Sequence, residues 1–200
     1  HSGGSIGSVL GPRQGERAEE LQQRADIALY RAKAEGRGRG VMFSPEMEAT
    51  LVERRALEAD LRRALAEGAL TLAYQPKFAL AGADGIARPE GCEALLRWHH
   101  PQRGAVSPAV FVPVAEEAGL AAELSRFVLA AACAQVRDWQ RQGLEVRVAV
   151  NLSALHFASD QAVVLVEEAL AASGVPARLL EIEVTEGVFI RNAAAARATL

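Results

Sequence analysis

Hydrophobic residues recur at three- and four-residue steps through two stretches in the first third of the chain. In residues 16–35 small and apolar side chains form one stripe opposite arginines and glutamates, and Gly36 ends the pattern. Residues 45–67 show a narrower apolar face, preceded by Ser44-Pro45 and followed by Gly68. The pattern predicts two helices. Because the apolar face of the second is too narrow for full burial, we expect residues 44–67 to form a linker helix.

Short apolar runs, bounded by turn residues or amphipathic stretches, mark the strands that we expect. These strands lie at residues 5–10, 41–43, 70–80, 92–98, 145–151 and 179–185, and further helices at 108–118, 121–142 and 161–173. From residue 70 onward strands and helices alternate, which is typical of an α/β fold with a parallel sheet covered by helices. The largely apolar run at 146–150 suits a strand buried on both faces, as in a barrel or a doubly wound sheet.

Composition narrows the classes of function. Half of the residues are hydrophobic and the formal net charge is only -3, which indicates a globular protein without a field of one sign. We therefore expect no nucleic-acid partner, and no apolar run approaches the roughly 20 residues that span a bilayer, so we expect no membrane contact. Cys92 and Cys133 form no CxxC pair and lie in apolar surroundings. We interpret them as buried thiols, which fits a reducing, cytoplasmic location.

Oxygen-bearing side chains stand where three of the expected strands finish: Glu93, Asn151 and Glu183. Ligands bind at strand ends in α/β folds. Carboxylate and carboxamide oxygens without His or Cys suit Mg²⁺ or Mn²⁺ rather than zinc, and a phosphate ester is then the natural substrate. Taken singly, each residue also fits a structural role, because an Asn at a strand end is often a turn residue and a lone Glu is often ion-paired or at an edge.

Five motifs in order resemble those of the EAL family. They are Tyr74-Gln75-Pro76-Lys77, Glu93-Ala94-Leu95-Leu96-Arg97-Trp98, residues 108–119, Val150-Asn151-Leu152-Ser153 and Glu183-Val184-Thr185-Glu186. The resemblance implies an incomplete TIM-like (β/α)8 barrel whose first strand is antiparallel. It also implies metal-dependent hydrolysis of cyclic-di-GMP to linear pGpG.

The resemblance also implies a role for each matched residue. The metal ligands of a two-metal Mg²⁺ or Mn²⁺ site would be Glu93, Asn151 and Glu183. The substrate contacts would be Gln75, Leu95 and Arg97. The catalytic carboxylates would be Glu93, Glu183 and Glu186, of which Glu186 would steady an active-site loop. Two ions held by carboxylates could acidify a bridging water and neutralise the phosphodiester. We expect the first three residues to converge at neighbouring carboxyl ends of strands.

The first 43 residues resemble the tail of a GGDEF domain. Ser5-Ile6-Gly7 resembles its late strand, and residues 25–33 with Gly36-Arg37 resemble its last helix. The cyclase loop is absent, because Gly3-Gly4 is followed by Ser5-Ile6. The expected organisation is therefore a GGDEF tail at 1–43, the linker helix at 44–67 and the first portion of an EAL domain at 68–200.

Both ends of the chain look cut, because it begins without Met and stops at Leu200 inside a helical pattern. The paired aspartates, the lysine and the later glutamate of the family would follow Leu200, so we expect the 200-residue chain to be inactive alone. A catalytically inactive EAL module that binds cyclic-di-GMP or a protein is the main alternative, and an unrelated barrel enzyme is a third. All four acidic and amide motif residues are present, which favours the enzyme. A homodimer through the EAL domain is possible on the same resemblance.

Overall fold

The computed structural model describes residues 4–11, 17–79, 87–158 and 160–184. The chain divides into two compact units, His1–Ala59 and Asp60–Leu200, and the boundary between them falls inside one helix.

The first unit contains a two-stranded sheet and a helix. Its elements are β1 (Ile6–Ser8), α1 (Ala18–Ala34), β2 (Gly40–Met42) and the first part of α2 (Pro45–Glu67). β1 pairs with β2 in parallel. A side chain at Gly7 would collide with backbone atoms of Ala25 and Leu29, so only glycine lets β1 lie directly on α1. Ala28 and Ala32 of the apolar stripe expected in α1 are buried, and Ile27, outside that stripe, is buried as well.

α2 is one uninterrupted helix from Pro45 to Glu67. It confirms the helix predicted at 44–67, including its start after Ser44 and its end before Gly68, whose φ of 67° is in the left-handed region that glycine adopts without strain. Leu57, Leu61 and Ala64 are the buried side chains of this helix.

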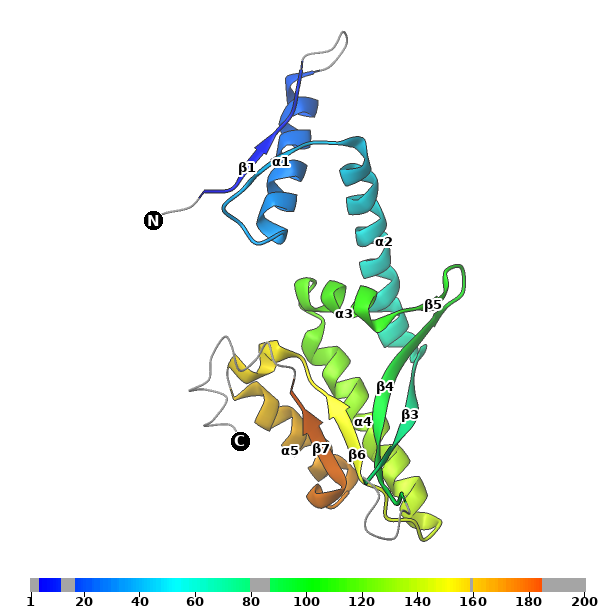
Figure 1. The fold of residues 1–200 in the computed structure, drawn as a ribbon. Helices are drawn as coiled ribbons and strands as arrows, with labels where there is room; N and C mark the ends of the chain where they lie inside the picture. Colours follow the sequence, from blue (N-terminus) through cyan, green and yellow to red (C-terminus); the bar gives the residue numbers. More distant parts are fainter. Residues whose placement is uncertain (1–3, 12–16, 80–86, 159, 185–200) are drawn as a thin grey trace. The chain divides into compact units, whose positions relative to one another are not determined.

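The second unit is an α/β arrangement around one sheet. Its elements after α2 are β3 (Leu70–Phe78), β4 (Pro89–His100), β5 (Gly104–Val106), α3 (Pro108–Glu117), α4 (Ala121–Arg141), β6 (Val148–Asn151), η1 (Ala154–Ala158), α5 (Gln161–Ser173), η2 (Ala177–Leu179) and β7 (Leu180–Glu183). The strands lie in the order β3-β4-β6-β7, with β5 paired to β4 (Figure 1). β3 is antiparallel to β4, whereas β4, β6 and β7 are parallel, as the sequence predicted.

The two faces of this sheet differ in chemistry because successive strand residues point to opposite sides. One face carries Cys92, Ala94, Val148 and Val150, which pack with residues of α4 and α5 in the hydrophobic core. The helical core residues are Val128, Leu129, Ala132, Cys133 and Val136 from α4 and Ala162 and Leu165 from α5. The opposite face carries polar and charged side chains, and we call it the polar face.

The sheet is curved so that the polar face is concave. Lys77 on β3 and Glu183 on β7 stand at opposite ends of the strand order, three interstrand spacings apart, or roughly 14 Å in a flat sheet. Side chains stand roughly perpendicular to a sheet. The Lys77 ammonium nevertheless lies 3.0 Å from a Glu183 carboxylate oxygen, so the outer strands must bend toward each other over this face.

Candidate functional site

Two of the expected metal ligands are in direct contact on the polar face. The Nδ2 amide of Asn151 donates a hydrogen bond to Oε1 of Glu93 over 2.7 Å. Asn151 also lies opposite Glu183 in the parallel register of β6 and β7. The three residues therefore stand on the three neighbouring strands β4, β6 and β7, as the sequence predicted.

The position of Glu93 in its strand corrects the sequence analysis. Asn151 and Glu183 end β6 and β7, but Glu93 lies inside β4, which begins at Pro89 and runs on to His100. β4 is this long because it pairs along its length with β3 and then with β5. The site thus lies at the carboxyl ends of two strands and against the middle of a third.

The residues expected to contact substrate are on the same face. In the antiparallel register Gln75 is opposite Glu93, and Leu95 and Arg97 follow Glu93 at two-residue steps along β4. Gln75 and Arg97 are exposed and Leu95 is half-buried. The Arg97 guanidinium donates to the Leu96 carbonyl over 3.0 Å, which leaves most of its five donors available to a ligand. Glu186 lies outside the described residues.

Sequence reasoning missed three charged residues at this site: Lys77, Glu181 and Arg147, whose guanidinium lies 3.9 Å from the Glu181 carboxylate. The Lys77 ammonium donates to Oε1 of Glu181 and Oε1 of Glu183, each over 3.0 Å. These hydrogen bonds, that to Glu181 first, raise the pKa of Lys77. Two-residue spacing was the available signal, because it places Glu181 on the face of Glu183 and Lys77 on the face of Gln75.

The donor set fits a hard divalent cation in kind. Glu93 and Glu183 offer carboxylate oxygens, and rotation of the Asn151 amide would turn its Oδ1 toward the place now taken by Nδ2. Within the described residues, no three side chains of His, Cys, Asp or Glu gather closely enough to hold a metal ion. To a metal site on this face, the proposed ligands would therefore contribute the carboxylates of Glu93 and Glu183 and the amide oxygen of Asn151.

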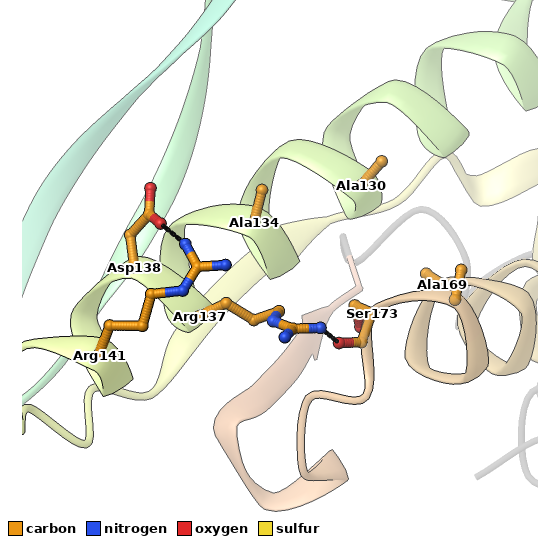
Figure 2. Close-up of a pocket in the computed structure, with 8 residues that line it drawn as sticks. Ala130, Ala134, Arg137, Asp138, Arg141, Ala169 and Ser173 are labelled. Atoms are coloured by element: carbon orange, nitrogen blue, oxygen red, sulfur yellow. Dashed lines mark hydrogen bonds and ion pairs between the residues drawn. The ribbon is translucent and has the colours of Figure 1, made fainter.

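A separate groove of about 470 Å³ runs between α4 and α5 (Figure 2). Its floor is largely alanine, from Ala130 and Ala134 on α4 to Ala169 on α5. The Arg137 guanidinium is bound to the Ser173 carbonyl, and Arg141 pairs with Asp138 at 2.5 Å. The groove lies between the two helices that cover the apolar face of the sheet, so it is distinct from the carboxylate site.

None of the described helices combines the length and the apolar character that a membrane crossing needs.

The fold and site together define an α/β domain with a concave sheet face that carries both carboxylates and cations. Residues 58–200 match the EAL domain family. This match covers most of the chain, which therefore belongs to the EAL domain family.

Relatives named for cyclic-di-GMP turnover match nearly the whole chain. The bifunctional diguanylate cyclase/cyclic di-GMP phosphodiesterase MucR of Pseudomonas aeruginosa is 42% identical over 190 residues, covering 94% of this chain and 27% of the relative. The cyclic di-GMP phosphodiesterase PdeR of Escherichia coli is 35% identical over 188 residues, covering 94% of this chain and 28% of PdeR. The chain thus spans about a quarter of the length of the curated relatives that it matches.

Solved structures of similar fold contain the nucleotide. The MucR phosphodiesterase in complex with c-di-GMP superposes with a TM-score of 0.65 at 42% identity, over 72% of this chain and 57% of that one. The FimX EAL domain of Xanthomonas citri in complex with c-diGMP gives a TM-score of 0.64 at 28% identity, over 76% of this chain and 58% of the FimX chain.

Proposed function

We propose that the protein hydrolyses cyclic-di-GMP to linear pGpG at the polar face of the sheet. The observation that carries the proposal is the contact of Asn151 with Glu93 beside Glu183, in a chain that belongs to the EAL domain family. Relatives named as cyclic di-GMP phosphodiesterases support the substrate. The activity is proposed for the protein that contains this chain.

The proposed metal ligands are Glu93, Asn151 and Glu183, which would hold Mg²⁺ or Mn²⁺ in a two-metal site that needs further ligands. A bound ion of this kind supplies an acidic water and neutralises charge on a phosphodiester. Each such ion takes about six oxygen ligands, more than these residues provide. Glu93 and Glu183 are also the proposed catalytic carboxylates, together with Glu186, which we propose steadies an active-site loop.

The proposed substrate contacts each offer a different interaction. The Arg97 guanidinium would donate to a phosphate oxygen, and the Gln75 amide could donate to or accept from a nucleobase or ribose. Leu95, between Glu93 and Arg97, would give apolar contact. The concave shape of the polar face brings groups from the outer strands toward one ligand.

The architecture proposed with this function is an incomplete TIM-like (β/α)8 barrel at 68–200. Two observations support this architecture. β3 is antiparallel to β4, whereas β4, β6 and β7 are parallel. The contact between Lys77 and Glu183 indicates that the sheet is curved. We also propose that residues 1–43 are a GGDEF tail joined through the linker helix at 44–67. The match with MucR supports this, because it extends over more residues than the EAL segment contains.

A second candidate function is a catalytically inactive EAL module that binds cyclic-di-GMP or a protein partner, including a second copy of itself as a homodimer. The observation that favours it is the Lys77 ammonium, which pairs with both Glu181 and Glu183 and would compete with a cation for these carboxylates. The two thiols are free and buried, which supports a reducing cytoplasmic compartment for either function.

The experiment measures linear pGpG by chromatography after incubating cyclic-di-GMP with protein expressed from the full reading frame, with Mg²⁺ or Mn²⁺ added. Glu93→Gln and Glu183→Gln should each reduce turnover by a factor on the order of 10³, because each removes a carboxylate from the metal site. Cys92→Ala is the matched control, since Cys92 is adjacent to Glu93 but is 5% exposed on the opposite face.

The two candidate functions give different results. Nucleotide binding without pGpG, unchanged by either glutamine substitution, would support the binding module. Full turnover by Glu93→Gln would show that the chemistry is placed on the wrong residues.

A further inference from the structure

The turn after β6 has little support from the sheet. Asn151 is the last residue of β6, and the pairing of β6 with β4 already ends at Val150. Beyond Asn151, among residues 152–158 and 160–184, the Leu152 amide donates one backbone hydrogen bond to the Glu183 carbonyl, at 3.4 Å. The Asn151 amide is oriented by its hydrogen bond to Glu93, whereas the backbone that carries Asn151 depends on what fixes the turn that follows.

Ser153 organises this turn. Its hydroxyl accepts a hydrogen bond from the Leu155 amide at 3.3 Å, and its carbonyl accepts one from the His156 amide at 3.1 Å. A serine hydroxyl has one proton to donate, and it goes to Oε1 of Glu116 over 2.6 Å. A hydrogen bond to an ionised carboxylate is shorter and stronger than a neutral one. Ser153 thus ties the turn after β6 to helix α3.

Glu116 is rigidly placed to receive that bond. It lies in the last turn of α3, a helix capped by Ser107 and anchored through the buried Phe111, Val114 and Ala115. A carboxylate near the carboxyl end of a helix is disfavoured by the helix dipole. Glu116 is half-buried at this unfavourable place, and its carboxylate accepts the hydrogen bond from Ser153.

The far end of the turn is held by His156, which is 1% exposed. Its Nε2 lies 2.9 Å from Oγ of Ser125 and 3.3 Å from the Ala121 carbonyl, and its Nδ1 lies 2.9 Å from Oε1 of Gln161. This end is fixed to α4 and α5, and Leu152 is buried in the hydrophobic core, so Ser153 is the residue between these two anchors, and its side chain is held by α3.

We propose that Glu116 is a positioning residue that acts through Ser153 to hold the Asn151 amide at the metal site. The inference rests on the proposed function of Asn151 as a ligand. Groups that orient a metal ligand typically change metal affinity by about 10- to 100-fold when they are removed.

The experiment titrates Mn²⁺ by calorimetry into protein from the full reading frame, without nucleotide. Glu116→Ala and Ser153→Ala should each weaken Mn²⁺ binding roughly tenfold, and the double variant should be no weaker than either single one, because both remove the same bond. Glu116→Gln should retain affinity within about threefold, since its amide oxygen can still accept from Ser153. The matched control is Glu117→Ala, which removes an exposed carboxylate from the same helix end.

Thermal unfolding of the same variants separates positioning from stability. A lower midpoint with unchanged Mn²⁺ affinity, or additive losses in the double variant, would overturn the proposal. Glu93→Gln in the same titration distinguishes a failure of the positioning role of Glu116 from a failure of the proposed metal site. If it abolishes Mn²⁺ binding while Glu116→Ala does not weaken it, this inference fails alone, whereas Mn²⁺ binding unchanged by Glu93→Gln would refute the site itself.

Discussion

Gly91, two residues before Glu93, sets the distance between β4 and the backbone that leads into β6. A Cβ atom at this position would lie 2.5 Å from the Arg147 carbonyl oxygen and 3.2 Å from its carbonyl carbon. These are backbone atoms, so they can move away only if the two strands separate. That separation would stretch the bond from the Cys92 amide to the same carbonyl, which is 2.9 Å long. Gly91→Ala should therefore destabilise the sheet beside the site.

The expected loss follows from three contributions. Overpacking against a fixed neighbour costs about 2 kcal/mol, and the weakened hydrogen bond costs about 1 kcal/mol. The lower entropy of an alanine in the unfolded chain returns about 0.7 kcal/mol. The net loss is about 2 kcal/mol, which corresponds to a fall of roughly 4 to 8 °C in the melting temperature of a domain of this size.

Tryptophan fluorescence is the appropriate assay, because the two tryptophans of the chain, Trp98 and Trp139, both lie in the unit Asp60–Leu200. The signal then reports the unfolding of that unit. Glu90→Ala is the control, since Glu90 is the exposed residue next to Gly91 and its loss should move the midpoint by no more than about 2 °C. A Gly91→Ala midpoint equal to that of the unchanged protein would refute the argument that backbone contact fixes this strand spacing.

Three further predictions concern charges and buried groups. Lys77→Met should tighten Mn²⁺ binding several-fold, because it removes a cation 3.0 Å from Glu183. The gain in affinity should be larger at low salt, where charges are screened less. Unchanged affinity in Mn²⁺ titrations at two salt concentrations would contradict this prediction. Burial, with a smaller contribution from Cys92, raises the pKa of Tyr74 to about 12, so absorbance at 295 nm in Tyr30→Phe protein should titrate near that pH. Since the folded pKa exceeds the unfolded value of about 10, stability present below pH 10 should be lost as pH rises toward 12. Burial raises the pKa of the Cys92 thiol, which should react slowly with a disulfide reagent until denaturant is added.

The elements that the sequence predicted best have clear start and stop signals. Ser44-Pro45 and Gly68 bounded α2 to the residue, and Pro108, Ala121 and Gln161 each began a helix that the structure contains. β5 was missed because three residues are too few to show alternation. β4 was predicted to start at residue 92, since Pro89 and Gly91 favour a loop, but pairing with β3 extends it to Pro89.

The sequence proposed members for the candidate site but could not give their contacts. The motifs identified Glu93, Asn151 and Glu183, whereas the strand neighbours of each residue depend on register, which no local pattern encodes. The Lys77 contact is the clearest case, because it joins residues 106 positions apart through the curvature of the whole sheet. Glu116 was likewise part of a recognised motif, and only its bond to Ser153 gives it a role.

The antiparallel pairing of β3 with β4 also bears on the order in which the protein folds. These strands are near neighbours along the chain, so closing the segment between them costs little entropy, whereas β6 and β7 are parallel additions from further on. During synthesis the β3–β4 pair can form first and offer β6 an edge on which to assemble. Glu93 and Gln75 would then be aligned across that pair before the strand bearing Asn151 leaves the ribosome.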